Sequence, residues 1–264
     1  MPILYMREEN KMINIGIKNE LIYVNYLNNK KVSELNPLIQ ELLYKVFNKI
    51  NDNNTVTARR SDLAEKTDII VTINEEERNF SLKIGDKNSF HMEPISEFIH
   101  FLIENGFEKE VIEKYLKFHY ADGTTNGTGT RRMSVSEYKE HYQKDIDYLN
   151  EKFKNKEFIN KCIERFILKG RIKNSREVDA VISGKVNDLL FITNKEVKDL
   201  VNKYIDIKTT GLHIGPLFIQ PHTRNLNYNK KYEKYRYCVQ IKWFNFTDHI
   251  IWYMNESVIK NQNM

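Results

Sequence analysis

Asp68, Ser81 and Lys83 are polar side chains within two short apolar segments of a 264-residue chain. Asp68 lies at the start of the segment over residues 67–73, and Ser81 and Lys83 lie in the segment over residues 78–85. Because side chains alternate along a β-strand, Ser81 and Lys83 share one face of the second segment. Pairing of the two segments as a hairpin would gather a carboxylate, a hydroxyl and an ammonium in one cluster.

Such a cluster has the parts that phosphodiester hydrolysis needs. A carboxylate oxygen can bind Mg²⁺, a hard ion that takes few protein ligands and keeps several waters. The bound ion polarises a phosphoryl oxygen and acidifies a water, while a nearby lysine can orient that water and offset developing charge. The alternative is a solvated strand edge, where a lysine prevents edge-to-edge pairing with another chain.

The surrounding sequence predicts an α+β fold with a mixed central β-sheet flanked by helices. Apolar residues at helical spacing predict helices over residues 33–50, over 93–118 with a break near Asn105-Gly106, and over 134–168 with Ser134 or Ser136 as the cap. A loop rich in Gly, Thr and Asn precedes the last of these. Further strands are expected near residues 178–183, 188–193, 204–207, 217–220 and 236–244.

Neither an internal repeat nor a flexible linker divides the chain, which predicts one domain over residues 1–264. Its core is expected at about 33–120, with a helical part that contacts the partner at about 121–264. The net charge of +5 is uneven: residues 1–108 carry 13 Lys/Arg against 17 Asp/Glu, and residues 109–176 carry 16 against 10. This polarity favours a polyanionic partner, with general lysine enrichment as the alternative.

The order of an aspartate on one strand and a polar-x-Lys motif on the next resembles the core of the PD-(D/E)xK nucleases. Ser81 departs from that pattern, because an acid usually stands there. The chain is more similar to the small type II restriction endonucleases of the MspI-like group, which carry a neutral Asn or Gln at this place. The Arg131-Arg132 pair and the Gln240-x-Lys242 strand also have counterparts in that group.

The resemblance covers roughly residues 60–245 and implies a Mg²⁺-dependent endonuclease of double-stranded DNA. It implies a short recognition site of about four base pairs, bound by a monomer or a two-fold symmetric homodimer, and a cognate DNA methyltransferase encoded nearby.

The resemblance also assigns roles to individual residues. Asp68 would be the essential metal ligand, Ser81 would take the second ligand position, and Lys83 would be the catalytic lysine. The main-chain carbonyl of Leu82 would also face the metal. Glu41, on the first predicted helix, is a further candidate ligand, and an ordinary charge on the helix surface is its alternative.

The residues predicted to contact DNA have side chains suited to phosphates, which position a protein, or to base edges, which specify sequence. They are Lys87, Asn88, Ser89, His91, Glu93, Arg131, Arg132, Gln220, His222, Arg224, Asn225, Asn227, Lys230, Lys231, Gln240 and Lys242. His91 and Glu93 are expected to open a helix, and with Pro94 they could instead cap it. The two consecutive arginines and the lysine-rich stretch could instead be solvated surface charges.

Other classes of protein are disfavoured. No apolar run approaches the roughly 18 residues of a membrane-spanning helix, and the N-terminal residues are charged too soon for a signal peptide. The two cysteines form no CxxC motif, so a reducing cytoplasm is expected. Motifs of nucleotide-binding loops, HExxH metalloproteases and GxSxG hydrolases are missing. A non-catalytic nucleic-acid-binding module, and a nuclease of repair or defence, remain the alternative functions.

Overall fold

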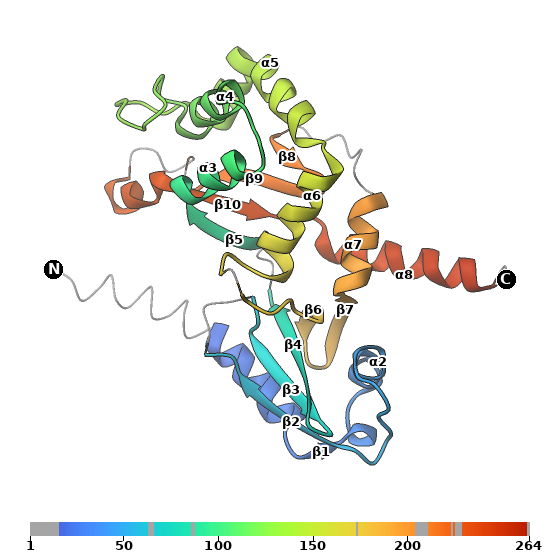
Figure 1. The fold of residues 1–264 in the computed structure, drawn as a ribbon. Helices are drawn as coiled ribbons and strands as arrows, with labels where there is room; N and C mark the ends of the chain where they lie inside the picture. The colour runs from blue at the N-terminus through green and yellow to red at the C-terminus, as the bar shows by residue number, and fades with distance from the viewer. Residues whose placement is uncertain are drawn as a thin grey trace. The chain divides into compact units, whose positions relative to one another are not determined.

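The computed structural model describes residues 16–62, 66–85, 88–172, 174–203, 211–222, 224 and 229–262. The chain forms two compact units (Figure 1). The first comprises Met1–Lys87, Ile167–Leu200 and Phe246–Met264, and the second comprises Asn88–Phe166 and Val201–Asn245. Residues 121–264 were expected to be helical and to contact DNA, but two strands within that range, at 180–185 and 188–193, join the sheet next to Asp68.

The first unit contains a six-stranded mixed sheet in the order β1-β2-β3-β4-β6-β7. Its strands are β1 (Lys30–Lys31), β2 (Thr55–Arg60), β3 (Ile69–Ile73), β4 (Glu76–Lys83), β6 (Ala180–Lys185) and β7 (Asp188–Thr193). All neighbours are antiparallel except β4 and β6, which run parallel. With the flanking helices, this sheet confirms the predicted α+β fold class.

The predicted hairpin forms between β3 and β4. Asn74 and Glu75 connect the strands, with φ of 49° and 66°. Two central residues with positive φ match the right-handed twist of paired strands, as in a type I′ turn. The turn therefore fixes the register that places Ile69 opposite Phe80.

One face of this sheet is covered by a helix over residues 16–27 and by α2 (Pro37–Val46). Their buried side chains join those of Ile69, Val71 and Phe80 in a single apolar core. Asn36 caps α2 by accepting a hydrogen bond from Ile39 N–H at 2.9 Å, which fits the preference for Asn at this position. The helix predicted over 33–50 is thus shorter, because a 3₁₀ turn, η1 (Val32–Glu34), precedes it. The remaining helices of this part are α7 (Asn194–Lys203) and α8 (Phe246–Gln262).

The second unit contains a four-stranded antiparallel sheet in the order β5-β10-β9-β8. Its strands are β5 (Ser89–Pro94), β10 (Cys238–Lys242), β9 (Leu217–Pro221) and β8 (His213–Ile214). Helices α3 (Ile95–Glu104), α4 (Lys109–Tyr120), α5 (Val135–Phe153) and α6 (Lys156–Ile163) pack on it (Figure 1). A π-helical turn, η2 (Glu164–Leu168), extends α6, and a 3₁₀ helix, η4 (Lys230–Tyr237), precedes β10.

Several predicted boundaries are confirmed in this unit. The helical segment breaks at Asn105-Gly106, where Gly106 has a φ of 77°. Ser134 caps α5 and forms a reciprocal capping box with Glu137. One expectation is wrong: residues 89–94 form strand β5, so His91 and Glu93 lie on a strand and not at a helix start. The strand predicted at 204–207 lies outside the described residues.

Within the described part of the chain, every helix is too short or too polar to cross a membrane.

Candidate active site

The Asp68 carboxylate lies where the β3–β4 ladder ends. Its Oδ2 accepts a hydrogen bond from Ser81 Oγ at 3.1 Å and another from the Leu82 main-chain N–H at 2.6 Å. Pairing of β3 with β4 stops at Ile69, so Leu82 has no ladder partner on β3. The carboxylate takes the place of that partner. Asp68 and Ser81, which the sequence predicted to meet, are therefore in contact.

Lys83 lies two residues after Ser81 on β4 and opposite Ser183 of β6. Alternation along the strand puts its side chain on the same face of the sheet as Ser81. Lys83 is half-buried. Burial lowers its pKa from the ordinary value for lysine, and the negative charge of Asp68 opposes this effect. A lysine in such surroundings gives up its proton more readily than a solvated one.

The donor set around Asp68 can be tested against Mg²⁺. Both hydrogen bonds end on Oδ2, and Asp68 Oδ1 accepts none from the residues that the structure describes. The carbonyl of Leu82 lies on the same side of β4 as its N–H, since both groups of a residue face one neighbour. Mg²⁺ is commonly bound by one or two carboxylates together with substrate phosphates and waters. These oxygen donors fit that ion.

The same residues do not fit a transition metal held by protein ligands alone. No group of three or more His, Cys, Asp or Glu side chains that could hold a metal occurs in the described parts of the chain. Zinc sites need three or four such ligands. The donor set therefore favours a hard ion whose coordination is completed by substrate.

Glu41, the further candidate ligand, lies on α2 and is exposed. Its carboxylate contacts Lys45 Nζ at 3.4 Å, and Lys45 also contacts Glu196 at 3.4 Å. The structure thus places Glu41 in a surface ion-pair network and gives it no contact with Asp68.

A helix over residues 16–27 was missed by the sequence reasoning, and it covers the face of the sheet opposite to the Asp68 side chain. Glu20, on the helix over residues 16–27, contacts Arg60 Nε at 2.7 Å. Arg60 pairs with Ile69, the residue that follows Asp68. The apolar spacing of residues 21–27 could have predicted this helix, although nothing in the sequence pairs Glu20 with Arg60.

Two arginines predicted to contact DNA are buried inside the second unit. Arg132 donates from Nε to Tyr120 O and from Nη2 to His119 O, both at 3.0 Å. Arg224, 1% exposed, donates to Phe118 O at 2.8 Å, Met133 O at 2.9 Å and Ser134 O at 3.3 Å. Burial lowers the pKa of each to about 10. Both guanidinium groups hold main-chain segments together, contrary to the prediction that they reach DNA.

Glu93 is also buried, on β5, and does not reach a surface. Its Oε2 accepts from Arg165 Nη2 at 2.9 Å and lies 3.0 Å from His91 Nε2. Burial alone would raise the pKa of Glu93, but the hydrogen bonds and charges of His91 and Arg165 outweigh it, so the pKa is lowered. Glu93 is therefore engaged in a buried ion pair, which leaves its carboxylate no exposed surface with which to contact bases.

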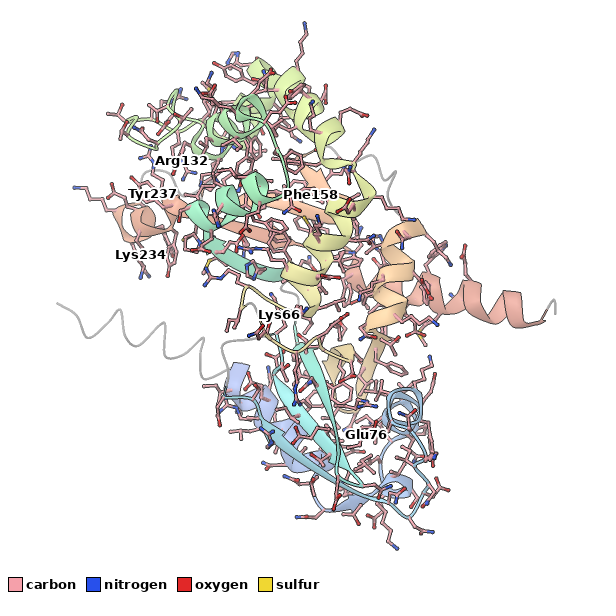
Figure 2. The ribbon with its side chains drawn as sticks, viewed as in Figure 1. Lys66, Glu76, Arg132, Phe158, Lys234 and Tyr237 are labelled. Atoms are coloured by element: carbon pink, nitrogen blue, oxygen red, sulfur yellow. The ribbon has the colours of Figure 1, made fainter. Side chains whose placement is uncertain are left out.

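Other predicted DNA contacts lie on more accessible parts of the second unit. Arg131 is exposed and pairs with Glu137. Lys230 and Lys231 are exposed on η4, as is Lys234, which projects from the same helix in Figure 2. Asn88 is exposed, Ser89, Gln220, His222, Gln240 and Lys242 are partly exposed, and Lys87, Asn225 and Asn227 lie outside the described residues.

Contacts further restrict the partly exposed residues. Gln240 Nε2 donates to Ser89 Oγ at 2.9 Å, and Gln220 stands opposite Gln240 in the β9–β10 register. Gln220 Oε1 is buried and has no hydrogen-bond partner among the described residues. The pKa of His222 is lowered by burial and by the charge of Lys242. This surface therefore combines amides with a neutral imidazole and cations.

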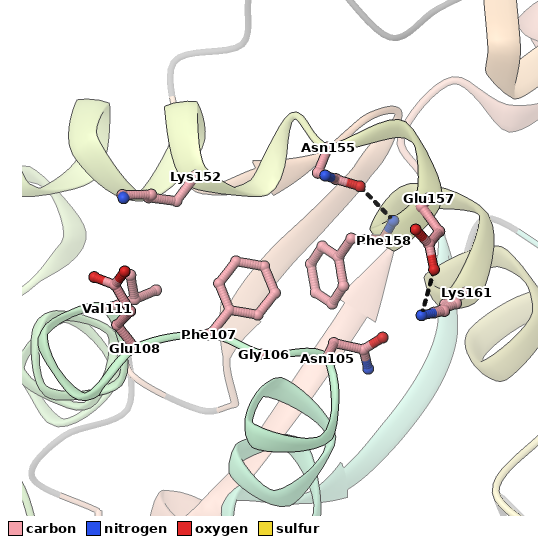
Figure 3. Close-up of a pocket in the computed structure, with 10 residues that line it drawn as sticks. All are labelled: Asn105, Gly106, Phe107, Glu108, Val111, Lys152, Asn155, Glu157, Phe158 and Lys161. Carbon is pink, nitrogen blue, oxygen red and sulfur yellow. Dashed lines mark hydrogen bonds and ion pairs between the residues drawn. The ribbon is translucent and has the colours of Figure 1, made fainter.

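A separate cavity of about 270 Å³ lies in the second unit between the start of α4 and α6 (Figure 3). Its polar groups serve the helices that line it: Asn155 caps α6 by accepting from Phe158 N–H at 3.0 Å. Glu157 pairs with Lys161 at 2.7 Å, one turn along the same helix. None of the predicted site residues lines this cavity.

The solved structure of the restriction endonuclease MspI in complex with its cognate DNA is similar to this chain. The TM-score is 0.47 and the sequence identity 16%, over 77% of this chain and 76% of that one. Comparisons with protein families and with curated proteins give no match. Because this similarity is low, the chemistry of the site follows from the residues and distances of this chain alone.

Proposed function

We propose that the chain is a Mg²⁺-dependent endonuclease that hydrolyses phosphodiester bonds in double-stranded DNA, as a type II restriction enzyme does at a short specific site. The supporting observation is the Asp68 carboxylate, whose Oδ2 accepts hydrogen bonds from Ser81 and Leu82 and whose Oδ1 accepts none from the described residues. Lys83 lies on the same strand and on the same face as Ser81. This combination supplies an anchored hard oxygen donor beside a desolvated amine.

Asp68 Oδ1, the Leu82 carbonyl and Ser81 Oγ would hold the ion, which supplies charge stabilisation at the phosphoryl oxygen and a more acidic water. Ser81 Oγ and Leu82 N–H keep the carboxylate from rotating, so the donor is oriented before substrate arrives. The amine of Lys83 would orient the attacking water and accept its proton, a role that the lowered pKa favours.

DNA would be held by exposed cations and amides of the second unit. The η4 lysines lie beside tyrosine rings, with Lys234 Nζ 4.9 Å from the Tyr235 ring centroid. Such cations suit the phosphate backbone, and they make binding salt-dependent. A palindromic site would suit a homodimer, and a monomer could also bind it. A host would need a cognate methyltransferase to protect its own sites.

The decisive experiment is digestion of plasmid DNA by the purified protein with Mg²⁺, with and without EDTA. Discrete bands that disappear with EDTA, and that the Asp68→Asn and Lys83→Met variants do not produce, are expected. Full cleavage by both variants would remove the proposed site.

A non-catalytic nucleic-acid-binding module is the second candidate, and Ser81 is the observation that favours it. A neutral hydroxyl stands where most PD-(D/E)xK nucleases carry an acid, and Asp68 already has a structural role, because it accepts the Leu82 N–H where the β3–β4 ladder ends. This function predicts salt-sensitive DNA binding without cleavage. Cleavage without a fixed sequence would instead indicate a nuclease of repair or defence.

A further inference from the structure

A cavity of about 510 Å³ opens on the sheet of the first unit, beside the Asp68 cluster. Arg59 of β2, Ile70 of β3 and Asn79 of β4 form part of its lining. The register pairs Ile70 with both Arg59 and Asn79, so the three side chains share one face of the sheet.

That face is the one that carries the proposed active site. Asn79 and Ser81 are two residues apart on β4, and Ile70 and Asp68 are two apart along the neighbouring chain segment, so each pair points to the same side. Two residues of strand span roughly 7 Å. The cavity therefore occupies the next row of side chains after the Asp68–Ser81 row.

Two guanidinium groups at the cavity share a single carboxylate. Arg59 Nη2 lies 3.1 Å from Glu77 Oε1, and Arg176 Nη1 lies 3.6 Å from Glu77 Oε2. Arg59, Arg176 and Glu77 together carry a net charge of one positive unit. Asp62 also lines the cavity, but its carboxylate is exposed, so solvent and salt weaken its effect on this charge. Arg176 is 72% exposed, so its side chain can turn toward a ligand.

Two polar side chains of the lining, Thr67 and Asn79, are buried, and the hydroxyl of Thr67 has no hydrogen-bond partner among the described residues. Thr67 is 4% exposed, and its Oγ1 makes no hydrogen bond within that part of the chain. Asn79 is 6% exposed. Its main-chain N–H donates to Asp179 Oδ2 at 2.7 Å, whereas its side-chain amide has no hydrogen bond to a described residue. A buried polar atom without a partner, such as Thr67 Oγ1, destabilises the free protein, and a ligand that supplies the missing bond removes that penalty.

We propose that this cavity binds a backbone phosphate of the DNA strand next to the phosphate that is cut. The inference rests on the proposed function. DNA carries one phosphate per roughly 3.4 Å of axis on each strand, so a neighbouring phosphate is within reach of the next side-chain row. Arg59 and Arg176 supply charge, and the hydroxyl of Thr67 and the amide of Asn79 supply neutral donors. Held there, the strand presents the scissile phosphate to Asp68 in a fixed position.

The test is a titration of the ¹⁵N-labelled full chain, in EDTA, with a 5′-phosphorylated dithymidine. The Asn79 side-chain amide signals, assigned by their loss in Asn79→Ala, should shift and saturate. A dithymidine with a neutral methylphosphonate linkage and no 5′-phosphate should leave them unmoved. The Arg59→Gln/Arg176→Gln double variant should bind the phosphorylated probe at least tenfold more weakly. Lys18→Gln, an exposed cation on the helix that covers the opposite face, should bind it like the wild type.

Plasmid cleavage measured in parallel separates the two claims. Cleavage by the wild type with unmoved Asn79 signals, or with equal probe affinity in the double variant, overturns the phosphate cavity and leaves the nuclease standing. Shifts of Asn79 that depend on the arginines support the cavity, and if no cleavage accompanies them the nuclease proposal fails by itself. Thermal unfolding of the double variant must match the wild type, and since both arginines are mostly exposed, we expect that it does.

Discussion

Asp68 of the first unit and Asp122 of the second both accept hydrogen bonds, but they differ in how many of their carboxylate oxygens do so. Asp122 uses both oxygens: Oδ1 accepts from Thr124 N–H at 2.9 Å and Thr124 Oγ at 2.7 Å, and Oδ2 accepts from Gly129 N–H at 3.1 Å. Arg236 also pairs with Oδ2. Among the residues that the structure describes, Asp68 is held through Oδ2 only.

The side chain of Asp122 is fully buried by its own loop, so no ligand can reach it. A Cβ built at Gly129 would lie 2.3 Å from the Asp122 carbonyl oxygen, so only glycine fits the loop that wraps this carboxylate. Burial would raise the pKa of Asp122, but the hydrogen bonds of Thr124 and Arg236 outweigh it and lower the pKa. A carboxylate with hydrogen bonds to both oxygens, such as Asp122, stabilises its own loop. A carboxylate such as Asp68, with one oxygen not bonded to a described residue at the end of the β3–β4 ladder, can still bind an ion.

The largest difference is expected when each aspartate is replaced by asparagine. Asp68→Asn should lower the cleavage rate by roughly 10³-fold or more, because several kcal/mol of charge stabilisation is lost, with little change in melting temperature. Asp122→Asn should destabilise the protein by about 3 kcal/mol, since it removes the negative charge that pairs with the partly buried guanidinium of Arg236. Cleavage rates and calorimetric unfolding of both variants test this. A folded Asp68→Asn protein that still cleaves DNA would contradict the proposed role of Asp68 as a metal ligand.

Arg224 and Arg131 allow a second comparison, between a buried arginine that stabilises the fold and an exposed one that is available to DNA. Arg224→Met should lower the free energy of unfolding by about 3–5 kcal/mol, because three buried carbonyls lose their donor. Arg131→Met, in the segment before α5 that Arg224 contacts, should unfold like the wild type, because the Arg131 side chain is 62% exposed. Denaturant unfolding compares them. Equal stability of the two variants, with weaker DNA binding by Arg224→Met, would restore Arg224 as a DNA contact.

Replacement of Lys83 by methionine should separate activity from stability. Cleavage should fall roughly 100-fold or more with the loss of the proton acceptor. The lowered pKa of Lys83 means that, between its folded value and the ordinary 10.5, the unfolded chain binds more protons. The wild type therefore gains stability as pH rises through that window, and the destabilising effect is complete below it.

Unfolding free energies measured across alkaline pH check this sign. At neutral pH the wild type should be less stable than the Lys83→Met variant, and the difference should shrink as pH approaches 10.5. A wild type that instead loses stability relative to the variant over this range would indicate a salt-bridged Lys83, and a difference that does not change with pH would indicate a solvated one.

The smallest effect is expected at Ser81. Ser81→Ala removes one of the two hydrogen bonds that orient Asp68, which should weaken the apparent Mg²⁺ affinity about 10–100-fold. The dependence of the cleavage rate on Mg²⁺ concentration measures it. An unchanged Mg²⁺ dependence would mean that Leu82 alone fixes the carboxylate.

Local sequence patterns predicted much of the fold. The alternation around Asp68 and Ser81 predicted the hairpin, and Ser134 was one of two caps predicted for the start of α5, where it forms a capping box with Glu137. Strand β5 was missed because its residues alternate over a short polar stretch, and it pairs with β10, which is distant along the chain. Long-range pairing of this kind has no signal in a local window.

By itself, the sequence determined the α+β class, the contact of Asp68 with Ser81 and the placement of Lys83 on their face, because strand alternation and a two-residue turn are local rules. Only the tertiary structure decided which charged residues face inward. Arg132, Arg224 and Glu93 were predicted from the sequence to contact DNA, but in the structure their partners are carbonyls and side chains from distant segments. Whether a charge binds a ligand or holds the fold together depends on what surrounds it, and packing alone sets that.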